Sequence, residues 1–139
     1  MAPEVIARKL AFLRRLLLDL EPFRNASVAD VERDHYKVER LLELLGTAAS
    51  DLVYHLLAER GLTPTSYRDA FRQAGREALI AADLAERLAK AAGLRNVLVH
   101  LYQGIDYEIL QASIVPALRD FAELVAVLEG QIDDASDES

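Results

Sequence analysis

The stretch VERDHYKVERLLELLGTAASDLVYHLLAER, residues 31–60, decides the fold of this chain. Its apolar residues recur mostly at intervals of three and four, which is the spacing of one face of an α-helix. They are Val31, Val38, Leu41, Leu45, Ala48, Leu52 and Leu56. Ser27 and Asp30 offer capping chemistry before the stretch, and Gly61 offers a stop after it. The pattern therefore predicts one long helix that ends near Gly61.

The segments on both sides of this stretch also have helical periodicity. The first carries a stripe over residues 6–20, with Pro3 in its first turn and Pro22 and Asn25 after its end. The others are a loop over 61–66, a short helix over 67–73, an alanine-rich helix over about 77–92 with Gly93 as its stop, and a last helix after Gly104. Pro116 in that helix indicates a kink or a late start. The prediction is an all-α fold, an up-and-down antiparallel bundle of four to five helices.

Length and composition favour one domain with one core. The chain has 139 residues, of which 52% are hydrophobic, and we expect a single helical domain over 1–132 followed by an acidic, disordered tail over 133–139. Cysteine is absent, which excludes disulfides, zinc–thiolate sites and thiol catalysis. We expect no membrane span, since charges interrupt every apolar run, and no signal peptide. The expected location is the cytoplasm.

The net charge of −7 argues against a broad basic surface for duplex nucleic acid. An RNA-binding role would therefore require a locally basic cleft. The candidates for such a cleft are Arg95 and Arg40. A symmetric pair of subunits would supply each of them twice.

Polar residues gather in the segment Gly93-Leu94-Arg95-Asn96-Val97-Leu98-Val99-His100-Leu101-Tyr102. On a helix of about 100° per residue, its four polar side chains fall within an arc of about 160°. Those four are Arg95, Asn96, His100 and Tyr102, whereas Val97, Leu98 and Leu101 fall on the opposite side. Val99 interrupts the polar face, and we expect a second subunit to cover it there.

These residue types suit phosphodiester cleavage. Arginine presents a planar fork of donors to phosphate, and histidine titrates near neutral pH and acts as general base or acid. RNA supplies its own nucleophile, the 2′-hydroxyl, so no metal is required. Two histidines, one as base and one as acid, would come from a symmetric dimer. By spacing alone, a helix with arginine, histidine and tyrosine on its exposed face is usually an ordinary polar surface.

The segment from Arg95 to Tyr102 resembles the R-x4-H-x-Y motif of HEPN-domain ribonuclease toxins of the HepT type, the DUF86 family. Further similarity extends over about residues 38–106. It includes Val38-Glu39-Arg40-Leu41-Leu42, Asp51 with His55, and Ser66-Tyr67-Arg68-Asp69-Ala70-Phe71. Leu101 departs from the family, which often has glutamate at this variable position.

The resemblance implies a HEPN-like homodimer with its cleft between the subunits. It implies metal-independent RNA cleavage, in which Arg95 and His100 are catalytic and Asn96 supports them, without a cofactor. It also implies a partner, an MntA-type nucleotidyltransferase antitoxin that transfers AMP to Tyr102. The alternative is a non-catalytic helical module that binds such a nucleotidyltransferase.

Two further pairs, each of a carboxylate and a histidine, are candidates for a functional site. Asp51 and His55 lie four residues apart and share a helix face, either as a structural pair or as cleft residues. Glu32 and His35 form an E-x-x-H pair, but no second pair of this kind exists in the chain. We therefore expect no metal site.

Overall fold

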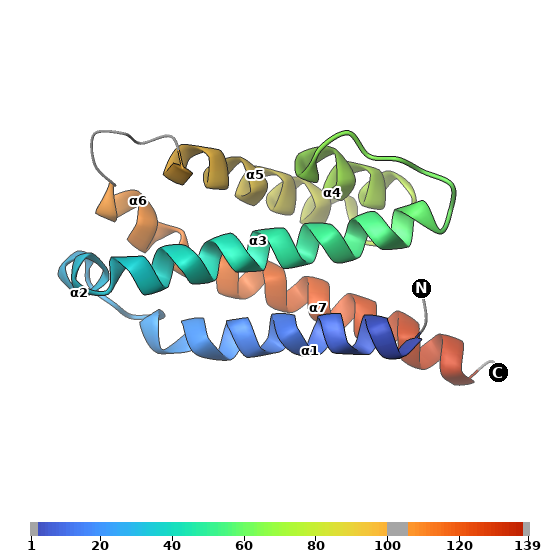
Figure 1. Cartoon of the computed structure of the whole chain (residues 1–139), viewed down its shortest axis with the longest axis horizontal. Coiled ribbons are helices and arrows are strands. Elements are labelled where there is room, and N and C mark those ends of the chain that lie inside the picture. Colours follow the sequence, from blue (N-terminus) through green and yellow to red (C-terminus); the bar gives the residue numbers. More distant parts are fainter. Residues whose placement is uncertain (1–2, 100–105, 138–139) are drawn as a thin grey trace.

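Four long helices form an up-and-down bundle in the computed structural model, which describes residues 3–99 and 106–137. They are α1 (Pro3–Leu20), α3 (His35–Ala58), α5 (Ala82–Val99) and α7 (Ile114–Asp137). Successive long helices run in opposite directions, and the two chain ends lie at the same end of the bundle (Figure 1). Four shorter elements connect them: the 3₁₀ turn η1 (Glu21–Phe23), α2 (Val28–Arg33), α4 (Tyr67–Arg76) and α6 (Tyr107–Ala112). The predicted all-α bundle is confirmed.

The long helix predicted from residue 30 onward is wrong at its beginning, because it is two helices. The predicted capping at Ser27 is present as a capping box, in which Ser27 and Asp30 satisfy each other's backbone N–H groups. After one and a half turns the chain bends at Asp34, with φ −108° and ψ 26°, and α3 starts at His35. Asp34 is neither glycine nor proline, so the local sequence gives no sign of this bend.

The alanine-rich helix begins later and ends later than its sequence pattern indicates. Residues 77–81 form a turn in which Ala78 has a positive φ of 57°, and α5 starts at Ala82. Gly93 does not stop the helix, since α5 continues to Val99. The glycine serves a close contact instead, described below.

The last predicted helix is also divided. α6 ends at Ala112, and α7 begins at Ile114, so that Pro116 lies in the first turn of α7. A first turn tolerates proline because its N–H groups have no partner within the helix. The late start is therefore the correct one of the two interpretations. α7 remains helical to Asp137, beyond the domain boundary at residue 132, and that boundary and the tail over 133–139 stay predictions.

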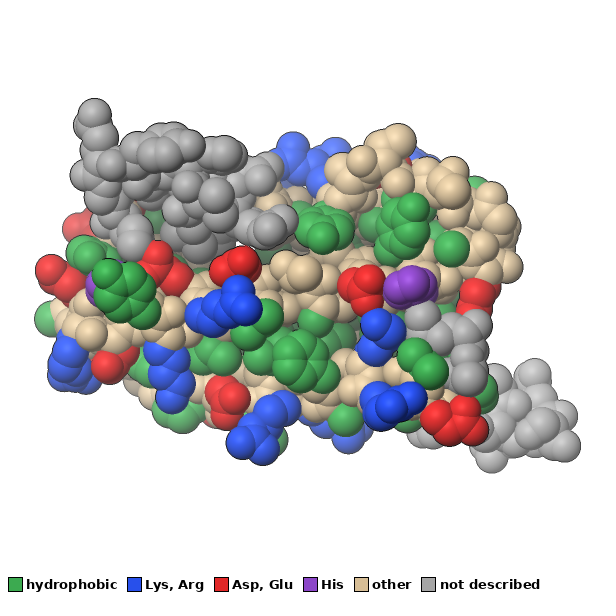
Figure 2. All heavy atoms as spheres, viewed as in Figure 1, with side chains coloured by type: hydrophobic (Ala, Val, Ile, Leu, Met, Phe, Trp, Pro, Cys, Tyr) green, Lys and Arg blue, Asp and Glu red, His purple; other side chains and the backbone are tan. Residues whose placement is uncertain are grey.

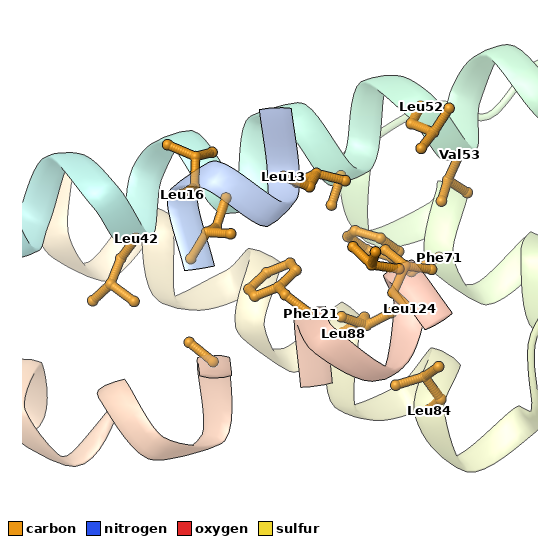
Figure 3. Packing of buried hydrophobic residues seen from close by; sticks show 14 of the residues in the cluster. Leu13, Leu16, Leu42, Leu52, Val53, Phe71, Leu84, Leu88, Phe121 and Leu124 are labelled. Carbon is orange, nitrogen blue, oxygen red and sulfur yellow. The ribbon is translucent and has the colours of Figure 1, made fainter. Parts of the chain in front are cut away.

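The core lies on the axis of the bundle, between the four long helices and α4. Leucine dominates it, with two phenylalanines at its centre (Figure 3). The largest completely enclosed side chains include Leu13, Leu20, Leu45, Leu52, Phe71, Leu84, Leu88 and Leu124. Burying each of them removes apolar surface from water, which contributes roughly 1.5–3 kcal/mol per side chain.

One helix of the described residues, α3, is long and apolar enough to cross a membrane by length and composition alone. This differs from the expectation that charges interrupt every apolar run. Nine residues of α3 are buried, among them Leu45, Leu52 and Leu57, and they contact the surrounding helices. The apolar character of α3 is thus that of the central helix of a soluble bundle.

Candidate functional site

The candidate motif begins in the last turns of α5. The backbone is helical through Val99, so Arg95 and Asn96 lie in α5, as the helical wheel requires. His100 and Tyr102 lie outside the residues that the structure describes, as do Leu101 and Gly104. The shared face of Arg95, Asn96, His100 and Tyr102, and the subunit contact at Val99, stay predictions.

The helix that carries the motif is fixed by close packing against α4. A Cβ atom added to Gly75 of α4 would lie 2.6 Å from the Cβ atom of Ala85 on α5, so only glycine allows this approach. Leu84, Leu88 and Ala89 of α5 are completely buried. Glycine on α4 and alanine on α5 thus let the two helices approach closely, and the motif follows a rigidly held segment.

Arg68, at the start of α4, lies directly on α5 just before the motif. A Cβ atom added to Gly93 would lie 2.5 Å from Nη2 of Arg68 and 3.5 Å from its Cζ atom. The missing side chain at Gly93 therefore makes room for the guanidinium. The signal for this contact was present in the sequence as a glycine inside a helical segment. Its position near the end of the apolar pattern favoured a helix stop instead.

The start of α4 is itself held by one carboxylate. Asp69 accepts hydrogen bonds from the backbone N–H of Thr65 at 3.0 Å and from the side-chain amide of Gln73 at 2.8 Å. The hydrogen bond from the Thr65 backbone is the largest cause of the lowered pKa of Asp69. Desolvation opposes it, and the hydrogen bonds from the Thr65 and Gln73 side chains lower the pKa further. Ser66 caps the helix by accepting the N–H of Asp69. These contacts fix the backbone on which Arg68 sits.

Asp51 and His55 are in contact, as their spacing predicts, with 3.3 Å between Oδ1 and Nε2. A third residue, which the sequence did not indicate, completes the group: Nζ of Lys9 on α1 lies 2.7 Å from Oδ2 of Asp51. His55 is 46% exposed. Arg40 lies apart from this group and pairs with Glu43 at 3.4 Å on the exposed surface of α3.

Three hollows in the surface meet at Tyr67. One of about 530 Å³ lies between α1 and α3 and includes Phe12, Ala48 and Asp51 in its lining. Hydrophobic side chains gather along this line between the two helices, with charged groups around them (Figure 2). A second, of about 390 Å³, lies between α3, α5 and α7, and a third, of about 690 Å³, lies between α3, α4 and α5. The second and third both include Ala92, just before the motif.

A cluster of charged side chains around the buried Asp120, the Asp120 cluster, joins α5 to α7 beside the second hollow. Asp120 is only 4% exposed and contacts both Arg87 of α5 and Nε of Arg119, the latter at 2.9 Å. Arg87 also donates to Glu123 at 3.1 Å and to Asp83 at 3.2 Å. The bond to Glu123, with the contribution of Asp120, raises the pKa of the Arg87 guanidinium although desolvation opposes it. Nothing in the sequence pattern pointed to Asp120.

The imidazole of His35 in the E-x-x-H pair contacts residues other than Glu32. Nδ1 of His35 lies 2.6 Å from Oε2 of Glu39, one turn later, and the ring of His35 contacts Tyr36 and Tyr107. Across the described ranges, no three His, Cys, Asp or Glu side chains are grouped as metal ligands are.

A family model described as ribonuclease HepT-like matches residues 6–128, which is most of the chain. The chain belongs to the HepT-like ribonuclease family. The resemblance of Arg95–Tyr102 to the HepT motif thus agrees with similarity over the whole bundle.

Curated relatives of this HepT-like chain carry nuclease names. It is 33% identical over 124 residues to the tRNA nuclease HepT of Aphanizomenon flos-aquae. This alignment covers 86% of this chain and 84% of that protein. It is 32% identical over 85 residues to the mRNA nuclease HepT of Shewanella oneidensis, covering 60% of this chain and 64% of the relative. The two relatives are named for different RNA substrates, so family membership does not select one.

A solved structure shares the fold of the HepT-like chain. The tri-AMPylated Shewanella oneidensis HEPN toxin, in complex with an MNT antitoxin, superposes with a TM-score of 0.81 at 25% identity. The alignment covers 94% of this chain and 99% of that one. The HEPN-like bundle predicted from the sequence is therefore confirmed.

Proposed function

We propose that this HepT-like chain is the ribonuclease toxin of a toxin–antitoxin pair and cleaves RNA without a metal ion. The observation that carries the proposal is the set Arg95, Asn96, His100 and Tyr102, retained in a chain whose family and 33%-identical relative are ribonucleases. Arg95 would bind the scissile phosphate through its guanidinium, and Asn96 would support it. The site would act in the cytoplasm as a cleft between two subunits.

The proposed reaction uses the 2′-hydroxyl of RNA as the nucleophile. His100 takes the proton of that hydroxyl, the 2′-oxygen forms a bond to phosphorus, and the bond from phosphorus to the 5′-oxygen breaks. The leaving 5′-oxygen receives a proton from His100 of the partner subunit, so the products are a 2′,3′-cyclic phosphate and a 5′-hydroxyl. Each subunit supplies one histidine, which is why the proposal requires a homodimer.

The test is RNA cleavage by the purified chain in the presence of EDTA. His100→Ala should lower the rate by about 10²–10⁴, the usual contribution of a positioned general base or acid. His35→Asn is the matched control, because it removes an imidazole that pairs with Glu39 outside the motif. Circular dichroism checks that both variants fold. Unchanged cleavage by His100→Ala would remove the role assigned to His100.

The alternative function is a non-catalytic module that binds a nucleotidyltransferase. Two results together would support this alternative. The wild-type chain would form a tight complex with the nucleotidyltransferase, and it would not cleave RNA under any condition in which the RNA is bound.

We further propose that an MNT-type nucleotidyltransferase neutralises the toxin by AMP transfer to Tyr102. The support is that the solved HEPN toxin with this fold is described as tri-AMPylated and bound to an MNT antitoxin. In the transfer, the oxygen of Tyr102 forms a bond to the α-phosphorus of ATP, pyrophosphate leaves, and the phenolic proton is released. A modified tyrosine two residues from His100 would block the cleft with added bulk and charge.

Co-expression with an MNT-type nucleotidyltransferase tests this second proposal. Mass spectrometry should find an adenylyl group on the peptide that contains Tyr102, and Tyr102→Phe should lose it. Tyr36→Phe is the control, because Tyr36 is the most exposed tyrosine among the described residues, at 81%, and lies outside the motif. An adduct that persists in Tyr102→Phe would contradict the assignment.

A further inference from the structure

Arg68 differs from the two other arginines of α4. Arg72 donates to Glu86 at 3.2 Å, and Arg76 lies 3.5 Å from Asp69. No carboxylate pairs with Arg68 within the described ranges, although Asp and Glu outnumber Lys and Arg by 23 to 16 in this chain. Its guanidinium rests on the bare backbone of Gly93 instead. The donors of Arg68 are therefore available to an anionic ligand.

The hollow beside Arg68 combines the groups that bind single-stranded nucleic acid. We call it the tyrosine groove, and its lining includes Tyr54, Thr65, Ser66, Tyr67, Arg68 and Ala92. Its volume of about 690 Å³ is in the range of small-ligand sites. Tyr54 and Tyr67 both line the groove and are 38% and 39% exposed as whole residues. Figure 2 shows hydrophobic side chains, a class that includes tyrosine, between α3 and α4.

Exposed tyrosine rings are stacking surfaces for unpaired bases, and arginine adds a phosphate contact beside them. Ser66 accepts the N–H of Asp69, yet its hydroxyl retains a hydrogen that it can donate. The groove thus offers flat rings, a fork of cationic donors and neutral hydroxyl donors within one hollow.

The tyrosine groove also lies next to the candidate motif. Arg68 touches Gly93, and Ala92 lines the groove, whereas Arg95 follows two residues later on the same helix. Positions 92 and 95 are three residues apart and therefore share a face of α5, separated by about 4.5 Å along the helix axis. A strand whose scissile phosphate lay at Arg95 would therefore run along the face of α5 that borders the groove at Ala92.

We propose that the tyrosine groove is a subsite for single-stranded RNA, in which Arg68 binds a phosphate that flanks the scissile one and Tyr54 and Tyr67 stack on bases. The inference rests on the proposed ribonuclease function and adds residues that the R-x4-H-x-Y motif does not contain. It would also explain how an acidic chain binds RNA, because no described carboxylate pairs with the cation that the substrate meets.

RNA binding by the full chain tests the proposal. A fluorescently labelled single-stranded oligonucleotide is titrated by anisotropy, in a His100→Ala background so that no cleavage occurs. Arg68→Ala should raise the dissociation constant about tenfold or more, the usual effect of losing a charged hydrogen bond. The slope of log K against log salt should become shallower by about 0.7, since one phosphate contact to a single strand is lost. Arg68→Lys should lie between, because lysine keeps the charge without the planar fork.

Arg72→Ala is the matched control, since it removes the next arginine on the same face of α4, whose charge is already paired with Glu86. Its affinity should stay within about twofold of the parent, as expected for a solvated ion pair. Tyr54→Leu should weaken binding by about fivefold or more, whereas Tyr54→Phe, which retains the ring, should bind as the parent does.

In the histidine-intact background, Arg68→Ala should raise the half-saturating RNA concentration and leave the maximal rate within about twofold. An Arg68→Ala variant with unchanged affinity and salt slope would overturn the subsite, as would one that weakened only the complex with the nucleotidyltransferase. Failure of the wild-type chain to cleave RNA would instead overturn the proposed function. The two failures are therefore distinguishable.

Discussion

Two arginines at α5, Arg87 on the helix itself and Arg68 packed against it, differ in the carboxylates that surround them. Arg87 of α5 is enclosed by three carboxylates, those of Asp83, Asp120 and Glu123. Arg68 rests on Gly93 of α5, and no described carboxylate pairs with it. In a chain with an excess of acidic residues, a cation that holds helices together has anionic partners from the chain itself. A cation without them is free for a ligand.

The difference also separates stability from binding. Removing an arginine or carboxylate from the Asp120 cluster leaves a partner with an unmet charge near the core, which is costly. Removing Arg68 does not deprive any described carboxylate of an ion-pair partner. The substitution should therefore lower the affinity for RNA and leave the free energy of unfolding nearly unchanged.

The largest loss of stability is expected for Asp120→Ala. Asp120 is 4% exposed, and the variant deprives Arg87 and Arg119 of a shared carboxylate. The free energy of unfolding should fall by about 1.5–3 kcal/mol, as for hydrogen bonds to charged groups. Urea denaturation measures it, and affinity for RNA under native conditions should not change. Equal stability of the variant and the parent would show that the cluster does not hold α5 to α7.

A smaller and pH-dependent loss is expected for Asp69→Asn. Hydrogen bonds from Thr65 and Gln73 lower the pKa of Asp69, so the folded state favours its ionised form. The stabilisation is complete above the unfolded pKa of about 3.9 and is lost as the pH falls through the lower folded value. The variant should lose about 1 kcal/mol near neutral pH.

The pH dependence provides the check on Asp69. Denaturation of the two proteins at a series of pH values between about 6 and 2 should show their difference in unfolding free energy shrinking toward the acid end. A difference that grew on acidification would contradict the direction of the pKa shift.

The smallest effect on stability is expected for Arg68→Ala, the variant with the largest expected effect on RNA affinity. An exposed arginine without an ion pair contributes little to folding, so the free energy of unfolding should change by at most about 0.5 kcal/mol. Thermal or urea unfolding of Arg68→Ala and Arg72→Ala, run together, measures it. A loss comparable to that of Asp120→Ala would assign Arg68 a structural role and weaken the comparison.

Helical periodicity was sufficient to predict the class of fold and most of the core. Leu13, Leu45 and Leu52 belong to regular stripes, and these three side chains are completely buried. The breaks between helices were less predictable. Asp34 interrupts a helical run without glycine or proline beside it, whereas Pro116 indicated the break at Ser113.

The candidate site was predicted unevenly. The helical placement of Arg95 and Asn96 was accessible from periodicity, and the contact between Asp51 and His55 was accessible from spacing, because residues four apart share a helix face. Lys9 and Asp120 were not accessible, since their partners are remote in the sequence: 42 residues separate Lys9 from Asp51, and 33 separate Arg87 from Asp120. Charges distant in the sequence have no fixed spacing, so only the folded chain pairs them.

By itself, the sequence determined an all-helical bundle, the absence of cysteine chemistry and the motif Arg95–Tyr102 that marks the family, because these depend on composition and on local periodicity. Only the tertiary structure decided the role of Gly93. A glycine near the end of an apolar pattern has the same sequence signature whether it stops a helix or admits a neighbour. Here the packing of α4 on α5 places the guanidinium of Arg68 where any side chain at position 93 would stand.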